Sequence, residues 1–250
     1  MPELSVLSLN VKKALNFLDE KPESSLGNAT AIVSVLGEDL GAATFQHCLE
    51  ANGAGKVLVR TEPVGTGKRK GPLLDRWIEA DFEGKRYLFQ TEIKSWSAHA
   101  IGGKKVSLCA TRAQLLEEKR RNWGKVWDPI NKSLSNKLVA KVLVPMKPPK
   151  DAESREILPL LIFWYPIGLG SRSQGRQLAK GGHLFSIPNP TAKTNSDVFP
   201  WPEHGDFPEL WVFSVSSYLR SLRKEVIELE MPQASARLRA LTRMVRIADG

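Results

Sequence analysis

Apolar and polar residues alternate along two neighbouring stretches of the chain, 74–82 (LDRWIEADF) and 85–96 (KRYLFQTEIKSW). An alternation with a period of two predicts β-strands, because successive side chains of a strand point to opposite faces of a sheet. Glu83 and Gly84 separate the two stretches, and a two-residue connection that ends in glycine is typical of a β-hairpin. The pattern therefore predicts two antiparallel strands joined by a tight turn.

The register of this hairpin brings three charged residues together. The apolar faces of the two strands match when Ile78 lies opposite Phe89, and the same register places Asp75 opposite Glu92. Lys94 is two residues beyond Glu92, so its side chain points to the same face. Two carboxylates at opposed positions destabilise a sheet unless a positive charge neutralises them. We therefore expect either a bound cation or a structural ion pair at this end of the hairpin.

The segments around the hairpin predict a mixed α/β core with helices packed on a sheet. The order expected from residue 31 to residue 146 is helix, three strands, helix, strand. The elements expected besides the hairpin are helices over 8–20, 31–52 and 111–127 and strands over 56–62 and 138–146.

A Pro-rich stretch (KPPKDAES, 147–154) separates this core from the rest of the chain. We expect three parts: an N-terminal helical segment (1–30), the core (31–150) and a C-terminal extension packed on the core (151–250). Within the extension the pattern predicts strands over 158–165 and 209–215 and two basic helices over 216–230 and 233–248.

Composition excludes several classes of protein. The two cysteines, Cys48 and Cys109, are too few for a disulfide framework or a cysteine-rich zinc site. No apolar run approaches the roughly 20 residues that a membrane-spanning helix needs, and the first 20 residues lack the basic-then-apolar order of a signal peptide. We expect a soluble, cytoplasmic protein with no membrane partner.

A surplus of basic residues indicates a polyanionic partner. Lys and Arg number 36 against 27 Asp and Glu, which gives a net charge of +9. Such a surplus suits a nucleic acid, with DNA expected first and RNA left open. The basic residues cluster over 65–71, 102–105, 117–127 and 237–246.

The three charged residues of the hairpin suit metal-dependent phosphoryl chemistry. Carboxylate oxygens are the ligands that Mg²⁺ takes, usually from one or two side chains together with water and substrate phosphate. A lysine beside them can position the attacking water or stabilise charge on phosphate oxygens. The residues alone leave a structural ion pair as an equal alternative.

Asp75, followed on the next strand by Glu92-Ile93-Lys94, resembles the PD-(D/E)XK nuclease superfamily. The resemblance covers residues 31–146 and implies the restriction-endonuclease-like fold, a core of order αβββαβ in which a central mixed sheet is flanked by helices. It also implies Mg²⁺-dependent hydrolysis of phosphodiester bonds, usually in DNA, with Mn²⁺ expected to replace Mg²⁺. The motif's proline usually precedes the aspartate directly, whereas here Leu74 does and Pro72 stands three positions before it.

The resemblance also implies roles for individual residues. Asp75 and Glu92, with the backbone carbonyl of Ile93, would bind the metal, and Lys94 would act on the attacking water. A glutamate on the preceding helix often supports the metal in this family, and Glu38 is the expected match, ahead of its neighbour Asp39. Gln90 shares a strand face with Glu92 and Lys94 and is expected to help position water or substrate.

Seven basic residues of the loops and of the helix expected over 111–127 are predicted to contact nucleic acid: Lys68, Arg69, Lys70, Lys104, Lys105, Arg120 and Arg121. The function expected is that of a metal-dependent endonuclease in DNA restriction, defence, repair or transposition. The alternatives are a non-cleaving nucleic-acid-binding or assembly subunit that keeps the fold, and an unrelated α/β binding protein whose acidic hairpin is structural. A homodimer or a partner protein is expected if both strands of a duplex are cut, because one such site cuts one strand.

Overall fold

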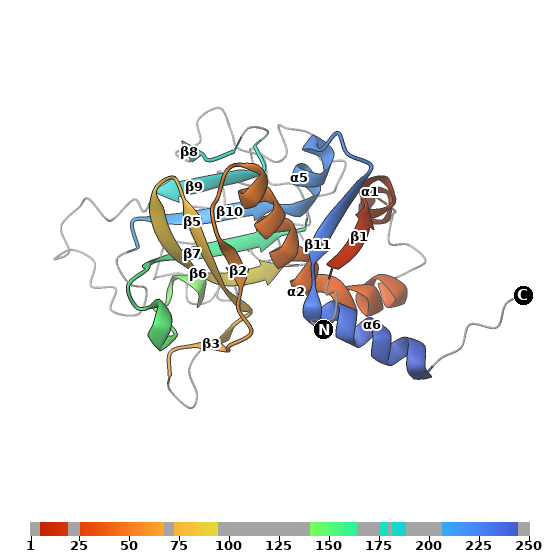
Figure 1. Cartoon of the computed structure of the whole chain (residues 1–250), viewed down its shortest axis with the longest axis horizontal. Helices are drawn as coiled ribbons and strands as arrows, with labels where there is room; N and C mark the ends of the chain where they lie inside the picture. Colours follow the sequence, from red (N-terminus) through yellow and green to blue (C-terminus); the bar gives the residue numbers. More distant parts are fainter. Residues whose placement is uncertain are drawn as a thin grey trace, which may run out of the picture.

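A seven-stranded mixed sheet forms the centre of the computed structural model (Figure 1). The structure describes residues 6–19, 26–67, 73–94, 141–164, 176–179, 182–188 and 207–244. Strands β6 and β7 are parallel, as are β7 and β10, and the other pairs are antiparallel. The strands, in spatial order, are β2 (Val57–Val59), β5 (Arg76–Phe82), β6 (Lys85–Lys94), β7 (Glu156–Phe163), β10 (Glu209–Ser214), β9 (Leu184–Pro188) and β8 (Arg176–Gln177).

The β5–β6 hairpin has the predicted register. Ile78 lies opposite Phe89, and the ladder continues to Arg76 opposite Thr91, one position short of Asp75 and Glu92. Glu83 and Gly84 form the turn with φ of 50° and 74°. Two successive positive φ values define the turn whose twist matches a hairpin, and glycine adopts this conformation at no steric cost.

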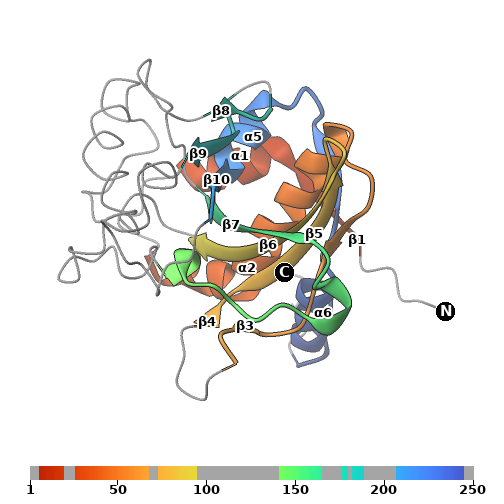
Figure 2. The same ribbon diagram turned by 90° about the vertical axis from the view of Figure 1, so that its left-hand side faces the viewer.

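Helix α2 (Leu26–Ala51) lies against one face of the sheet and contacts β2, β5, β6 and β7 (Figures 1 and 2). Its buried side chains include Phe45, which packs edge-on against Phe89 with ring centroids 5.6 Å apart. Gly41 permits the close approach, because a Cβ there would stand 2.9 Å from Cγ2 of Ile93. The glycine therefore brings the middle of α2 directly onto the end of β6.

The same face carries three shorter helices and a two-stranded sheet. Asn10 ends strand β1, and its Oδ1 accepts a 2.9 Å hydrogen bond from the backbone N–H of Lys13, so it caps α1. Buried apolar side chains of all these elements join one core with α2 and the central sheet. The elements are β1 (Val6–Asn10), α1 (Val11–Asp19), α5 (Val215–Ser221), β11 (Val226–Glu230) and α6 (Pro232–Met244).

The opposite face of the sheet is packed, in the described part of the chain, by two 3-10 turns and the residues between them. These are η2 (Lys141–Leu143) and η3 (Lys150–Ala152). Val142 and Leu143 are fully buried against Leu88, Trp77 and their neighbours. A small ladder of β3 (Val64–Gly65) and β4 (Leu73–Leu74) leads into the hairpin at this end of the sheet.

Three expected elements differ from the structure. The strand predicted over 138–146 is wrong for the described residues 141–146, where the chain forms η2 and then runs without regular structure, because Pro145 has no N–H and Gln90 takes the carbonyls of this segment. The helix predicted over 8–20 begins at Val11, since residues before it pair with β11. The helix predicted over 216–230 ends at Ser221, and 226–230 is a strand with alternating burial.

The central sheet draws strands from both halves of the chain. Residues 151–250, expected as an extension, supply β7, β8, β9 and β10, and β7 is the parallel neighbour of β6. The helix predicted over 111–127 lies outside the described residues. None of the helices described is long and apolar enough to cross a membrane. The architecture is thus mixed α/β, with a central mixed sheet flanked by helices.

Candidate functional site

Glu92 is fully buried near the end of β6, on the sheet face turned away from α2. One of its oxygens, Oε1, is ion-paired with Lys94 of the same strand face. The other, Oε2, lies 2.9 Å from Nζ of Lys141, at the start of η2. The side chains of both lysines remain partly exposed, at 24% for Lys94 and 25% for Lys141. The carboxylate is therefore enclosed, while its two cationic partners reach the solvent.

Asp75 occupies a bend between β4 and β5, directly beside the end of β6. Its backbone N–H donates a 3.0 Å hydrogen bond to the carbonyl of Thr91. Its side-chain Oδ2 accepts a 2.6 Å hydrogen bond from the backbone N–H of Ile93. The N–H and C=O of a residue in a strand point toward the same neighbouring strand, so the Ile93 carbonyl is directed to the Asp75 side. The structure thus brings together Asp75, Ile93, Glu92 and Lys94.

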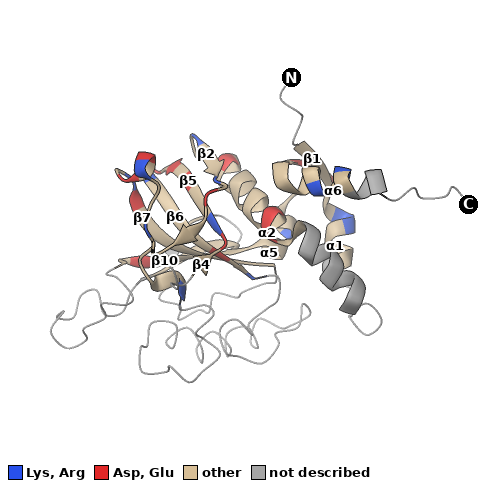
Figure 3. Ribbon diagram, turned by 90° about the horizontal axis from the view of Figure 1, so that it is seen from below, with Lys and Arg blue, Asp and Glu red and all other residues tan. Residues whose placement is uncertain are grey.

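Helix α2 presents two acidic residues to the start of β5 from the other face of the sheet. Glu38 and Asp39 form ion pairs with Arg76, at 3.1 Å and 3.0 Å. Arg76 also donates to the carbonyl of Asp75 (2.7 Å) and to Gln233 of α6 (3.2 Å). Figure 3 shows the acidic positions of α2 and the basic positions of α6 in ribbon form. Glu38, half exposed, is therefore close to Asp75 but is neutralised by an arginine.

Asp75 acts electrostatically on acidic residues from both faces. Burial and, secondly, the charge of Asp75 raise the pKa of Glu92, and the ammonium groups of Lys94 and Lys141 oppose this shift. Burial and then the charge of Asp75 also raise the pKa of Glu38, against the effect of Arg76. Like charges at short range make ionisation harder. Asp75 is therefore the centre of the acidic site.

The donor set is small for a metal ion. Within the described ranges, no group of three or more His, Cys, Asp and Glu side chains is placed to hold a metal. Two carboxylates with a backbone carbonyl nevertheless suit Mg²⁺, which keeps several waters and dehydrates reluctantly. Asp75, Glu92 and Ile93 fit that requirement, whereas Glu38 is held by Arg76.

Gln90 does not have the role expected from the sequence. It shares the face of Glu92 and Lys94, as predicted, but it is fully buried and its amide is bound to backbone groups. Its Nε2 donates to the carbonyls of Val142 and Val144, the latter at 2.9 Å, and its Oε1 accepts from the N–H of Met146 at 3.1 Å. Its amide oxygen and nitrogen therefore fix the segment after η2 instead of positioning water or substrate.

Lys141 and Arg76 were missed as residues of the site. Lys141 is a single charged residue within the apolar run LVAKVLV, and Arg76 is a single charged residue on the apolar face of the first hairpin strand. A lone charge at a position that the pattern buries needs a partner, and this signal was available in both cases. The partners themselves lie 49 and 37 residues away in the chain (Lys141 to Glu92, Arg76 to Asp39), which no local pattern indicates.

The seven basic residues predicted to contact nucleic acid lie outside the described part of the chain. Two of the clusters they belong to have their ends described. Lys68, Arg69 and Lys70 belong to the segment between β3 and β4, and Gly65 and Leu73 pair with each other on either side of it. Lys104, Lys105, Arg120 and Arg121 belong to the segment between Lys94 and Lys141. Both segments are therefore connected directly to strands or turns that carry residues of the acidic site.

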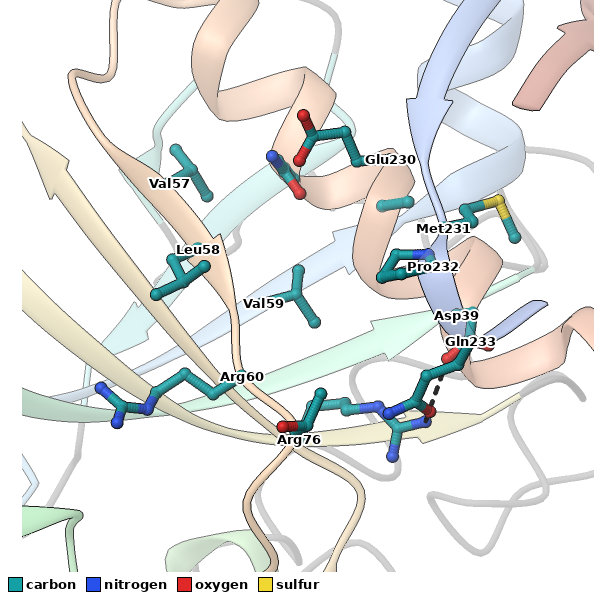
Figure 4. A pocket seen from close by; sticks show the side chains of 13 residues that line it. Asp39, Val57, Leu58, Val59, Arg60, Arg76, Glu230, Met231, Pro232 and Gln233 are labelled. Atoms are coloured by element: carbon teal, nitrogen blue, oxygen red, sulfur yellow. Dashed lines mark hydrogen bonds and ion pairs between the residues drawn. The ribbon is translucent and has the colours of Figure 1, made fainter. Parts of the chain in front are cut away.

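A pocket of about 120 Å³ lies on the α2 face, between β2, α2 and the junction of β11 with α6 (Figure 4). Asp39, Arg76 and Gln233 line one end, and the close-up shows them directed toward one another. Arg60 also lines the pocket but is bound by Glu62, Glu79 and Asp151. Asp75, Glu92 and Lys94 do not line it. The pocket is therefore separate from the buried carboxylate.

No protein-family model, curated protein or solved structure matches this chain.

Proposed function

We propose that this protein is a metal-dependent deoxyribonuclease of the PD-(D/E)XK type, with the restriction-endonuclease-like fold, that hydrolyses phosphodiester bonds. The observation that carries the proposal is the convergence of Asp75, Glu92 and Lys94 at one strand end, with Asp75 bonded to the backbone of Ile93. Two carboxylates, a carbonyl and a lysine with a partly exposed side chain are the groups that such a reaction uses.

Each residue has a distinct task in this proposal. Asp75, Glu92 and the Ile93 carbonyl would hold Mg²⁺ or Mn²⁺, and the bound ion would supply Lewis-acid activation of the phosphate and of a water molecule. Lys94 orients the attacking water and stabilises charge on the phosphate oxygens. Glu38 supports the strand end through Arg76.

The charge distribution supports a nucleic acid as the substrate. The chain has a net charge of +9, and the basic run around Lys68, Arg69 and Lys70 begins and ends at the β3–β4 ladder, immediately before Asp75. Lys and Arg contacts to phosphates hold a nucleic acid in place without reading its sequence. DNA is the substrate proposed, and RNA is the comparison to make.

Plasmid nicking tests this function. Wild-type protein is incubated with supercoiled plasmid in Mg²⁺, in Mn²⁺ and in EDTA, and a parallel series uses single-stranded RNA. We expect nicking of DNA in either metal and none in EDTA. Lys94→Ala should lower the rate at least about 100-fold, the scale seen when one group that stabilises transition-state charge is removed.

Lys85→Ala is the matched control, because Lys85 belongs to the same acid-x-Lys pattern (Glu83-Gly84-Lys85) but is exposed beyond the turn. Its nicking rate should equal that of the wild type. Cleavage that survives both EDTA and Lys94→Ala would overturn the proposal.

A non-cleaving nucleic-acid-binding or assembly subunit is the second candidate. It is favoured by the fact that both oxygens of Glu92 already have an ammonium partner, so the buried carboxylate needs no metal ion for neutrality. The same samples distinguish the candidates. A gel shift of DNA without nicking in any metal supports this one.

A further inference from the structure

Lys141 contacts both sides of the acidic site through one ammonium group. Its Nζ lies 2.9 Å from Glu92 Oε2 and donates a 2.9 Å hydrogen bond to the carbonyl of Leu73 in β4. β4 leads directly into Asp75. The side chain therefore bridges the strand that carries Glu92 and the strand end that carries Asp75, and a quarter of it is exposed.

The position of Lys141 is fixed by the buried amide of Gln90. The three hydrogen bonds of that amide hold the backbone from Val142 to Met146 against β6, two residues before Glu92. A buried amide with all of these partners satisfied holds a single conformation. The backbone that follows Lys141 is thus held in place by Gln90, and this fixes the position of Lys141 beside Glu92.

Glu92 has one ammonium near each oxygen, so a divalent ion that binds through this carboxylate meets two positive charges, and the withdrawal of one lysine favours its binding. Among the described residues, Lys94 has Glu92 as its partner. Lys141 has a second partner, the Leu73 carbonyl, which it keeps when it leaves Glu92. A cation that retains a hydrogen bond loses less on withdrawal than one that does not. Lys141 is therefore the group that exchanges.

We propose that Lys141 is an exchangeable counterion of Glu92. Its ammonium group balances the negative charge of the carboxylate before metal binds and afterwards pairs with a phosphate of the nucleic acid. This inference rests on the proposed nuclease function. It predicts that metal and phosphate assist each other, because a phosphate gives the released ammonium a new anionic partner. Such coupling is reciprocal between two ligands.

Replacing Lys141 with a neutral residue should tighten metal binding. A neighbouring charge commonly alters the affinity of a carboxylate for a proton by about tenfold or more, and a divalent ion carries twice the charge of a proton. Lys141→Met should therefore bind Mn²⁺ at least about tenfold more tightly than the wild type when no nucleic acid is present. If Lys141 helped to hold the metal, its replacement would weaken Mn²⁺ binding instead.

The experiment is a Mn²⁺ titration by calorimetry and by electron paramagnetic resonance at pH 8, where protons compete least for carboxylates. Wild type, Lys141→Met, Lys141→Arg and Lys147→Met are compared. Lys147 is exposed in the same segment, so Lys147→Met controls for the loss of one positive charge, and Lys141→Arg keeps the charge. We expect tighter binding in Lys141→Met alone.

A second titration adds a short duplex whose linkages are either phosphorothioate, which is charged and resists hydrolysis, or methylphosphonate, which is uncharged. The charged duplex should tighten Mn²⁺ binding to the wild type by roughly 5- to 150-fold more than the uncharged one. This difference should be smaller in Lys141→Met, which keeps only the direct contact between the ion and the phosphate. Lys141→Gln is measured in the same way and decides the question if Lys141→Met does not fold.

The outcomes separate the two proposals. A wild type that binds Mn²⁺ no better than Asp75→Asn overturns the metal site and with it the nuclease. A wild type that binds Mn²⁺ at Asp75, with binding unchanged or weakened in Lys141→Met or with equal effects of the two duplexes, overturns the role of Lys141 only.

Discussion

The Oδ2 atom of Asp75 and the backbone N–H of Ile93 are joined by a 2.6 Å hydrogen bond across the open end of the β5–β6 hairpin. This bond holds a carboxylate against the strand residue that lies between Glu92 and Lys94. It continues the pairing of the hairpin by one position after the regular ladder has ended at Arg76 and Thr91. The orientation of Asp75 is consequently set by the backbone and not by a flexible side-chain partner.

Asp75→Asn should separate the charge of this residue from its structural bond. The amide oxygen of asparagine still accepts from Ile93, so the free energy of unfolding should stay within about 1 kcal/mol of the wild type. Metal affinity should fall by at least about 100-fold, beyond the 10- to 100-fold loss typical of residues that only support a ligand. Urea unfolding and Mn²⁺ titration measure the two quantities. Asp81→Asn, near the other end of β5 and paired with Arg155, should bind Mn²⁺ like the wild type, and an equal loss in both variants would contradict the assignment.

Gln90→Leu should destabilise the protein by about 2 kcal/mol or more, because it removes the partner of the buried Val142 carbonyl and Met146 N–H and of the partly buried Val144 carbonyl. The midpoint of urea unfolding should fall accordingly. Gln46→Leu is the matched control, since Gln46 makes a single hydrogen bond to Glu50 of its own helix and should cost no more than about 1 kcal/mol. Equal midpoints for the two variants would show that Gln90 does not hold the segment.

Glu79 is a buried carboxylate on β5 between two arginines. Arg60 pairs with one oxygen, and Arg155 lies 3.0 Å from the other. Glu79→Ala removes charged hydrogen-bond partners, but Arg60 keeps Glu62 and Asp151, and Arg155 keeps Asp81. The substitution should therefore cost about 1.5–3 kcal/mol of unfolding free energy. The exposed pair of Lys85 and Glu156 provides the comparison, and Glu156→Ala should cost at most about 1 kcal/mol. A Glu79→Ala loss no larger than that of Glu156→Ala, measured by chemical denaturation, would refute the argument.

Acid should destabilise the fold through His183. Burial lowers the pKa of His183 below 6.5, so the folded chain favours the neutral ring and the unfolded chain binds the proton first. The contribution of the neutral His183 ring to the free energy of unfolding is fully present above pH 6.5. It is lost as the pH falls from 6.5 through the lower pKa of the folded state. His47, whose pKa is also lowered by burial, adds a change of the same sign. His183→Gln stays neutral, so its free energy of unfolding should fall less between pH 7.5 and 5 than that of the wild type, and identical falls would exclude His183 as a source.

The hairpin was predictable because its information is local. The alternation of apolar and polar residues predicted the two strands, and Gly84 predicted the turn between them. The match of Ile78 with Phe89 predicted the register that sets Asp75 beside Glu92. Lys141 was not predictable, because the contact with Glu92 depends on where a segment 49 residues later crosses the sheet. That segment had been expected as a strand on its apolar composition, and short apolar runs do not distinguish a strand from other buried chain.

The partner of β6 shows the same limit. The fourth strand of the expected core was placed at 138–146, whereas the strand beside β6 is β7, beyond the Pro-rich stretch. Both runs are apolar. Parallel strands are joined by a long connection, so no hairpin turn in the sequence shows which two strands are neighbours. The strand at 226–230 was missed for a similar reason, since its partner β1 lies at the other end of the chain.

The parallel pairing of β6 with β7 has a consequence for how the protein is made. β6 ends at Lys94, and β7 begins at Glu156, so more than sixty further residues must leave the ribosome before the second edge of β6 is covered. During that interval the strand carrying Glu92 has an open edge, of the kind that recruits other strands and causes aggregation. A chain cut after the Pro-rich stretch would keep this edge permanently. Fragments that end near residue 150 should therefore be insoluble, although they contain every residue assigned to the acidic site.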